Sequence, residues 1–258
     1  MKEFFGFGGY TRTPEGAFSW QHIAFVTSLM LIMIALATVF GIRNRNRDEK
    51  TKNRVLIAAA LSIDIIELFK IVMMCIIAKN SMRWLYELPL FMCSIQLITI
   101  PLAAFSKGRL REASLDFVAI FGLLGAFMGT YCASQNYACY PVISFDNVVS
   151  GITHSISGFA ALYIMVSGLL SLKRKNIGIS YIIITAFAVV AYAVNRIIDY
   201  NYMFLMRDDG TPYFVLFNLV EGHPVLYPLG VLALFIIYIT AFYGVYFFIK
   251  KRKTTNAL

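Results

Sequence analysis

The strongest constraint in this 258-residue sequence is its division into apolar blocks of about twenty residues, separated by short polar segments. A helix of twenty residues rises about 30 Å, which is the thickness of the hydrocarbon layer of a bilayer. Backbone groups find no water inside that layer, so each block must satisfy its own hydrogen bonds as a helix. None of the blocks alternates between polar and apolar residues as the strands of a membrane barrel do. The sequence therefore predicts an all-α membrane protein.

We expect a single bundle of seven transmembrane helices. Only 14% of the residues are charged, against about a quarter in a soluble domain. The first block is too long for the core of a signal peptide, so we keep it in the mature protein. Residues 1–19 then form an N-terminal tail, residues 20–249 the transmembrane domain and residues 250–258 a basic tail. The expected spans are Trp20–Ile42, Val55–Ala78, Leu85–Phe105, Ala113–Ala133, Val148–Leu172, Ile177–Ile198 and His223–Ile249.

The lysines and arginines predict the orientation of these helices. Sixteen of the 23 fall on one side of the predicted spans and six on the other, while Lys70 lies inside a span. Because basic residues gather on the cytoplasmic side, the N-terminus should lie outside and the C-terminus in the cytoplasm. We expect a multi-pass protein of the cell membrane. The formal charge of +9 then reflects short loops that meet anionic lipid headgroups, and not a nucleic-acid partner.

The second block contains three ionisable residues, which are costly in hydrocarbon and are functional candidates for that reason. Asp64, Glu67 and Lys70 are spaced three apart, so they share one broad face of a helix. That face must point into the bundle or into a wet cavity. The simplest structural interpretation is an ion pair between Lys70 and one of the two acids, and the functional interpretation is a binding site.

Cys93 and His154 suggest a chemical role for this region. Counted from the outer ends of their expected spans, they lie roughly 12 Å and 9 Å deep. A thiolate can attack an acyl carbonyl while an imidazole takes the thiol proton and later protonates the leaving group. Other polar residues in the outer half of the membrane complete a predicted pocket, either as hydrogen-bond donors to an oxyanion or as substrate-binding groups: Gln96, Asn195, Arg196, His22, Glu67 and Lys70.

Several motifs resemble the YwaF-like bacterial membrane proteins, relatives of the eukaryotic transmembrane protein 164, an acyltransferase acting on ether phospholipids. The resemblance rests on Leu88-Pro89-Leu90-x-x-Cys93, on His154, on the motif Asn201-Tyr202-Met203-x-Leu205-Met206 and on Phe18-Ser19-Trp20-Gln21-His22. It implies a seven-helix fold, a catalytic pair formed by Cys93 and His154, and phospholipid as substrate. It also adds Asn201 to the substrate-binding candidates. The family often has a histidine just before the cysteine, where this chain has Phe91 and Met92.

Other functions are compatible with the same residues. A transporter or channel would use Asp64, Glu67, Lys70 and His154 as an ion or proton relay, and would leave Cys93 as packing. A seven-helix receptor has no supporting motif. His22, His154 and His223 all lie toward the outer face, but no paired ligand motif exists, so we expect neither a metal nor a cofactor. Cys132 and Cys139 are placed for a disulfide or for two free thiols. The sequence does not indicate an oligomeric state.

The basic asymmetry makes the topology testable. A reporter fused after Leu258 should lie in the cytoplasm, and a tag placed before Met1 should be accessible from outside. Protease protection of the two tags in right-side-out vesicles would measure this. Finding both ends on the same side would mean that one span has been miscounted.

Overall fold

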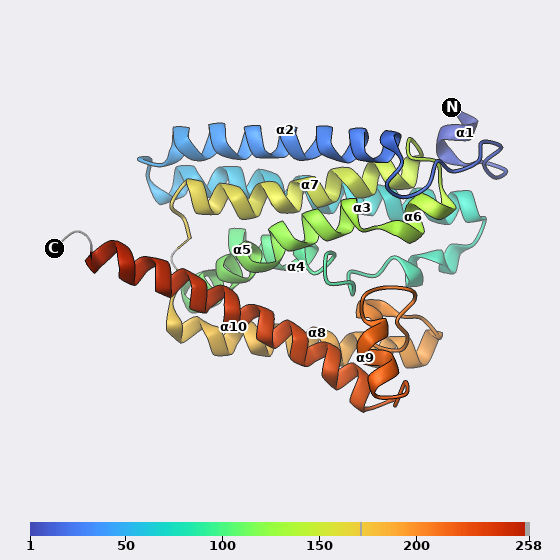
Figure 1. The fold of residues 1–258 in the computed structure, drawn as a ribbon. Coiled ribbons are helices and arrows are strands. Elements are labelled where there is room, and N and C mark those ends of the chain that lie inside the picture. Colours follow the sequence, from blue (N-terminus) through green and yellow to red (C-terminus); the bar gives the residue numbers. More distant parts are fainter. Residues whose placement is uncertain (171, 256–258) are drawn as a thin grey trace. The chain divides into compact units, whose positions relative to one another are not determined.

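A computed structural model describes residues 1–170 and 172–255 of the chain (Figure 1). The elements assigned in these residues are α-helices and short 3-10 helices, which confirms the all-α prediction. In chain order they are α1 (Lys2–Phe5), α2 (Trp20–Asn44), α3 (Glu49–Ala78), η1 (Ser81–Tyr86), α4 (Gln96–Phe105), α5 (Gly108–Tyr131), α6 (Ser134–Cys139), α7 (Phe145–Val166), η2 (Arg174–Asn176), α8 (Ile177–Ile198), η3 (Tyr202–Phe204), α9 (Phe214–Leu219) and α10 (Leu226–Thr255).

Within the described residues, five helices are long and apolar enough to cross a membrane: α2, α5, α7, α8 and α10. The chain is therefore a multi-pass membrane protein. Helix α3 is 30 residues long, so it is also long enough to cross, but its charged residues set it apart from those five. The count of seven spans and the orientation of the two ends stay predictions.

The third expected span, Leu85–Phe105, is wrong as a continuous helix. The chain leaves η1 at Tyr86, passes through turns, and becomes helical again only at Gln96. Pro89 explains the break, because proline lacks the N–H of a helix interior and disfavours helical geometry in the residue before it. The remaining α4 has ten residues and rises about 15 Å, half of the hydrocarbon thickness. Cys93 therefore lies in a turn and not on a helix.

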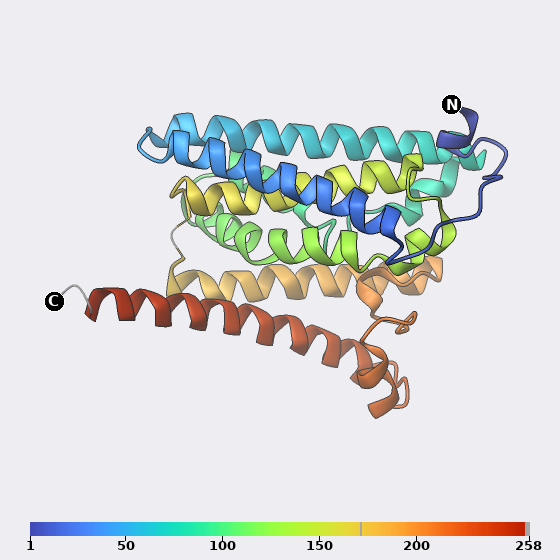
Figure 2. The ribbon, with the colours of Figure 1, turned by 45° about the horizontal axis from the view of Figure 1, so that its top comes forward.

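The chain divides into two compact units. Unit 1 comprises residues 1–89 and 96–170, and its helices pack around α7, which contacts α2, α3, α4 and α5 (Figures 1 and 2). A core of small and branched residues from these helices is fully buried, with Ala37, Leu56, Ile100, Val118 and Ile164 among its members. Unit 2 comprises residues 90–95 and the described residues from 172 onward, and in it α8 packs along α10.

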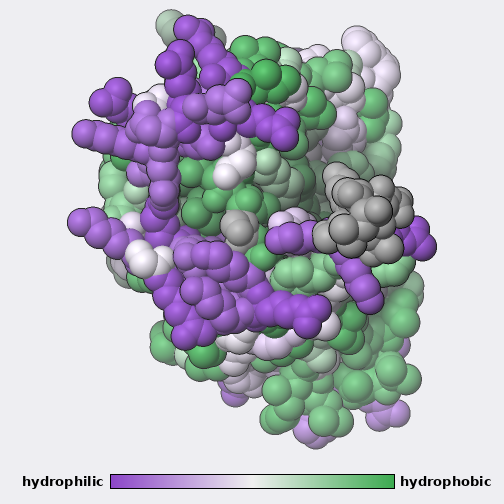
Figure 3. Space-filling model, turned by 90° about the vertical axis from the view of Figure 1, so that its left-hand side faces the viewer, coloured by the Kyte–Doolittle hydropathy of each residue, from purple (hydrophilic) through white to green (hydrophobic). Residues whose placement is uncertain are grey.

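Polar contacts close unit 1 at the end where α2 is joined to α3. Asp48 caps α3 by accepting a hydrogen bond from the Thr51 N–H. Arg111 of α5 pairs with Glu49 and donates to Asn53 of α3, and its Nε donates to the Ala103 carbonyl of α4 at 3.2 Å. Hydrophilic side chains gather over this end (Figure 3). The starts of α3 and α5 and the end of α4 are therefore tied together outside the apolar core.

The contact between α5 and α7 depends on glycine. A Cβ atom built on Gly122 would lie 2.7 Å from the Ala161 Cβ and 2.9 Å from the Ser157 carbonyl oxygen. Gly158 makes the reciprocal approach, because its Cβ would lie 2.8 Å from the Ala126 Cβ. Small residues thus let the two backbones come close, as in other membrane helix pairs.

We expect Gly122→Ala to destabilise unit 1, because the added methyl must push α5 away from the α7 backbone. A loss of about 1–3 kcal/mol is typical of such overpacking. Gly178→Ala in α8 is the matched control, since its Cβ meets no described atom within 4 Å. Thermal unfolding of the purified proteins in detergent would compare them. Equal midpoints for the two variants would contradict the close packing.

Candidate active site

A buried cluster of charged side chains lies in unit 1, around Lys70 of α3. The Lys70 Nζ is 3.3 Å from Glu67 Oε1, 3.2 Å from Glu87 Oε2 and 3.8 Å from Asp146 Oδ1. The side chains of all four residues are only 10–13% exposed. The ion pair expected between Lys70 and an acid of its own helix is thus present, with two more acids that the sequence did not indicate.

The segment after α3 supplies Glu87 to this cluster. Helix α3 ends at Lys79, which adopts a left-handed conformation (φ 50°), and the Asn80 side chain then accepts a hydrogen bond from the Met82 N–H to start η1. Arg83 of η1 binds Glu87 at 3.2 Å. The cluster therefore holds two cations and three acids, and it is anchored to the C-terminal end of α3 by a capped turn.

Helix α7 supplies Asp146 from its first turn. The Ser144 hydroxyl accepts a hydrogen bond from the Asn147 N–H at 3.4 Å and so fixes the start of the helix. The Asn147 amide donates to the carbonyls of Tyr140 and Pro141, at 3.3 and 3.0 Å. Burial raises the pKa of the Tyr140 hydroxyl, and the Asp146 carboxylate raises this pKa further. The start of α7 is thus held in place before any charge interaction is counted.

His154 lies two turns further along α7, about 12 Å from Asp146 along the helix axis. Its Nδ1 is 2.7 Å from the Ser150 carbonyl oxygen, which can only accept, so Nδ1 must carry the proton. In the tautomer that this contact requires, the lone pair is on Nε2. The ring lies directly against α5, because a Cβ on Gly129 would come within 2.0 Å of both His154 Nε2 and Cδ2. Any residue larger than glycine at position 129 would displace this imidazole.

His22 differs from His154 in its hydrogen bonding. It is fully buried, its Nδ1 accepts from the Phe18 N–H at 2.9 Å, and its Nε2 donates to the Thr130 carbonyl at 3.0 Å. The ring also lies 3.9 Å from that of Tyr137, centroid to centroid. Both nitrogens of His22 therefore tie the start of α2 to the end of α5. Gln96, also in unit 1, is fully buried and accepts a hydrogen bond from Thr99 at 3.1 Å.

Cys93 belongs to unit 2, in the segment 90–95 that replaces the expected helix. This segment is held by Phe91, whose ring lies 5.0 Å from Tyr202, 6.1 Å from Tyr200 and 6.0 Å from Phe204. The motif that begins at Asn201 therefore packs beside the motif that ends at Cys93. The aromatic side chain of Phe91 fills this contact.

Two asparagines shape the loop on which Phe91 packs. The Asn195 side chain accepts from the Tyr202 N–H at 2.7 Å and donates to the Tyr202 carbonyl at 3.0 Å. The Asn201 Oδ1 accepts from the N–H groups of Met206 and Arg207, and its Nδ2 donates to the Arg207 carbonyl. Both asparagines thus fold the loop, while Arg196 is exposed on α8. Their predicted role in substrate binding stays a prediction.

The sequence-based analysis missed Glu87, Asp146 and Gly129. Glu87 and Asp146 lie near the ends of expected spans, where charged residues are common and do not indicate a site. Only Lys70, inside a span, indicated that acids must surround it. Gly129 lies in the fourth expected span, and its sequence position does not show which side chain it faces. Among the described residues, no three His, Cys, Asp or Glu side chains are grouped as metal ligands would be.

The fold and these clusters define a multi-pass helical membrane protein with polar groups buried in its helical core. The chain matches the model of the TMEM164 family over residues 17–253, and it belongs to that family. This confirms the resemblance found in the sequence. No curated protein and no solved structure matches the chain.

Lys70→Met should destabilise the protein by about 3 kcal/mol, because it leaves three buried carboxylates without their shared cation. In a double-mutant cycle, Lys70→Met combined with Glu87→Gln should cost clearly less than the sum of the two. Unfolding in detergent would measure each variant. The exposed pair Arg207–Asp199, at 3.5 Å, is the control and should show almost no coupling. A Lys70–Glu87 coupling as small as that of the control would contradict the cluster.

Proposed function

We propose that this protein is a membrane-embedded acyltransferase acting on phospholipids, with Cys93 as nucleophile and His154 as base. The observation that carries the proposal is the 2.7 Å contact of His154 Nδ1 with the Ser150 carbonyl, in a chain that belongs to the TMEM164 family. The resemblance to transmembrane protein 164 supplies the reaction class. The Ser150 carbonyl holds the Nδ1 proton of His154 and so presents Nε2 as a proton acceptor, which is what a general base requires.

The first half-reaction would form a thioester. His154 Nε2 takes the proton of the Cys93 thiol, and the thiolate attacks the carbonyl carbon of a phospholipid acyl ester. The tetrahedral intermediate then expels the glycerol oxygen, which takes the proton back from the imidazolium. A lysophospholipid leaves, and the acyl chain stays bound to Cys93 through sulfur.

The second half-reaction would return the enzyme to its starting state. A hydroxyl of a lysophospholipid gives its proton to His154 and attacks the thioester, and the Cys93 sulfur leaves as thiolate and recovers the proton. Water in place of the lysophospholipid would make the protein an acyl-ester hydrolase by the same steps. Neither half-reaction needs a cofactor.

The surroundings of His154 support this proposal. Helix α7 is fixed at its start by the Ser144 cap and by Asp146 in the charged cluster, and Gly129 makes room for the imidazole against α5. A base held in one rotamer on a rigid helix loses little freedom in the reaction. We propose that the substrate approaches from the outer leaflet of the cell membrane, with its headgroup toward Glu67 and Lys70.

A lipid-like acyl electrophile should label Cys93 in membranes in preference to Cys75, Cys132 and Cys139. Cys93→Ala should abolish both labelling and acyl transfer, measured by mass spectrometry of lipids. His154→Ala should slow labelling about a hundredfold or more, as expected for loss of a general base. Gly129→Ala should slow it as well, because the methyl displaces the imidazole.

Cys75→Ala is the matched control, since that thiol is partly buried on α3 and lies outside the proposed site. It should label and turn over like the wild type. Full acyl turnover by the purified Cys93→Ala protein would refute the mechanism. The ion-relay alternative would then be tested by proton flux in liposomes, where Lys70→Met and His154→Ala should both abolish the flux.

A further inference from the structure

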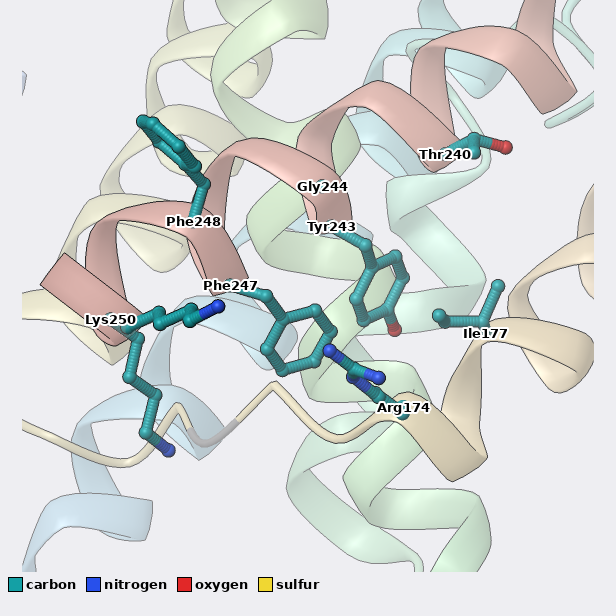
Figure 4. Close-up of a pocket in the computed structure, with 9 residues that line it drawn as sticks. Arg174, Ile177, Thr240, Tyr243, Gly244, Phe247, Phe248 and Lys250 are labelled. Carbon is teal, nitrogen blue, oxygen red and sulfur yellow. The ribbon is translucent and has the colours of Figure 1, made fainter.

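A groove of about 660 Å³ lies within unit 2, between the start of α8 and the end of α10. The segment before α8 contributes Arg174, and the last turns of α10 contribute aromatic and basic side chains (Figure 4). The residues that line it are Arg174, Ile177, Thr240, Tyr243, Gly244, Phe247, Phe248, Lys250 and Lys251. None of these nine, all within the described part of the chain, is acidic.

The basic side chains of the groove lie against an aromatic wall. The guanidinium carbon of Arg174 is 5.1 Å from the centroid of the Phe247 ring, within the range of a cation–π contact. Figure 4 shows Arg174 and Tyr243 on the same side of α10 as Phe247, with Phe248 pointing away from them. This contact places the exposed Arg174 guanidinium beside the aromatic wall of the groove, which Lys250 and Lys251 also line.

The wall is open at Gly244. A Cβ atom at this position meets no described atom within 4 Å, so the space beside the helix is accessible there. The hydroxyls of Thr240 and Tyr181 contact each other at 2.6 Å and join α8 to α10 beside the groove. The groove thus has an apolar and aromatic side along α10 and a cationic mouth.

The groove is separate from the proposed reaction site. Cys93 packs, through Phe91, near the loop that follows α8, whereas the groove lies at the start of α8. The 22 residues of α8 rise about 33 Å between these two ends. All four acidic residues of unit 2 (Asp199, Asp208, Asp209 and Glu221) are in the loops at the Cys93 end. The charge of unit 2 is therefore divided between its ends.

We propose that this groove binds the phosphate headgroup of an anionic glycerophospholipid as a second, non-catalytic lipid site. Helix α10 changes from apolar to basic between Ile249 and Lys250, so the cationic mouth lies at headgroup level and the aromatic wall at acyl-chain level. A phosphate diester with a net negative charge satisfies Arg174 and both lysines, and its acyl chains cover Tyr243 and Phe247. Basic pockets between transmembrane helices bind anionic headgroups in this way.

The test uses the full-length protein in detergent, titrated with phosphatidylglycerol or phosphatidylcholine and observed by native mass spectrometry. Phosphatidylglycerol should bind at least tenfold more tightly than phosphatidylcholine. The triple variant Arg174→Gln, Lys250→Gln and Lys251→Gln should bind phosphatidylglycerol about tenfold less tightly or worse. The control triple Arg45→Gln, Arg47→Gln and Lys50→Gln removes the same charge from exposed positions in the α2–α3 connection and the first turn of α3, and should stay within about twofold of the wild type.

A second pair of variants tests the space inside the groove separately from its charge. Gly244→Leu fills the open wall without changing any charge and should weaken phosphatidylglycerol binding several-fold. Gly178→Leu introduces the same side chain at an equally open position of α8 outside the groove and should not. Equal weakening by both triple variants, or unchanged binding in Gly244→Leu, would overturn the proposal. Lipid binding is measured here without acyl transfer, so the result does not depend on the Cys93 mechanism.

Discussion

The structure of unit 1 depends on the burial of one ammonium group, that of Lys70. An isolated cation in a low-dielectric interior costs several kcal/mol, so Lys70 can stay buried only while carboxylates surround it. Those carboxylates come from α3 itself, from the turn after η1 and from the first turn of α7. One charge thus fixes three segments at the end of the unit where α3 ends and α7 begins. Arg111 does the same at the other end of α3, where it binds α3 and α4.

The position of His154 follows from this arrangement. With α7 anchored at Asp146, its residues at intervals of three and four turn toward α5, and the two helices approach closely at Gly122, Gly158 and Gly129. At the last of these the neighbour is an imidazole instead of a methyl group. Close packing, which holds helices together in membranes, here also fixes the position of the His154 imidazole. The same contact explains why any side chain at position 129 would displace the imidazole.

Hydropathy predicted the helices well, because the thickness of the bilayer imposes one length on every spanning segment. Helix α8 begins and ends where the sequence placed it, at Ile177 and Ile198. The third span failed because a block average does not register the single proline that ends a helix. The sequence could predict that Lys70 needs acidic partners, but it could not identify those on other segments. Residue spacing predicts contacts within one helix and not between helices. The contact of Gly129 with His154 could not be predicted for the same reason, because the two residues lie on different helices.

The two ends of unit 2 meet different chemical environments, and its sequence reflects this. Asn195 and Asn201 use their amides to fold the loop beside the Cys93 segment, where all the acids of the unit lie. At the other end, Arg174, Lys250 and Lys251 line the groove between α8 and α10. A helix pair with fixed acidic and basic ends resists both inversion and vertical displacement, because either would move charge into hydrocarbon. A phosphate bound in the groove would add to that resistance by neutralising Arg174 and its neighbours at headgroup level.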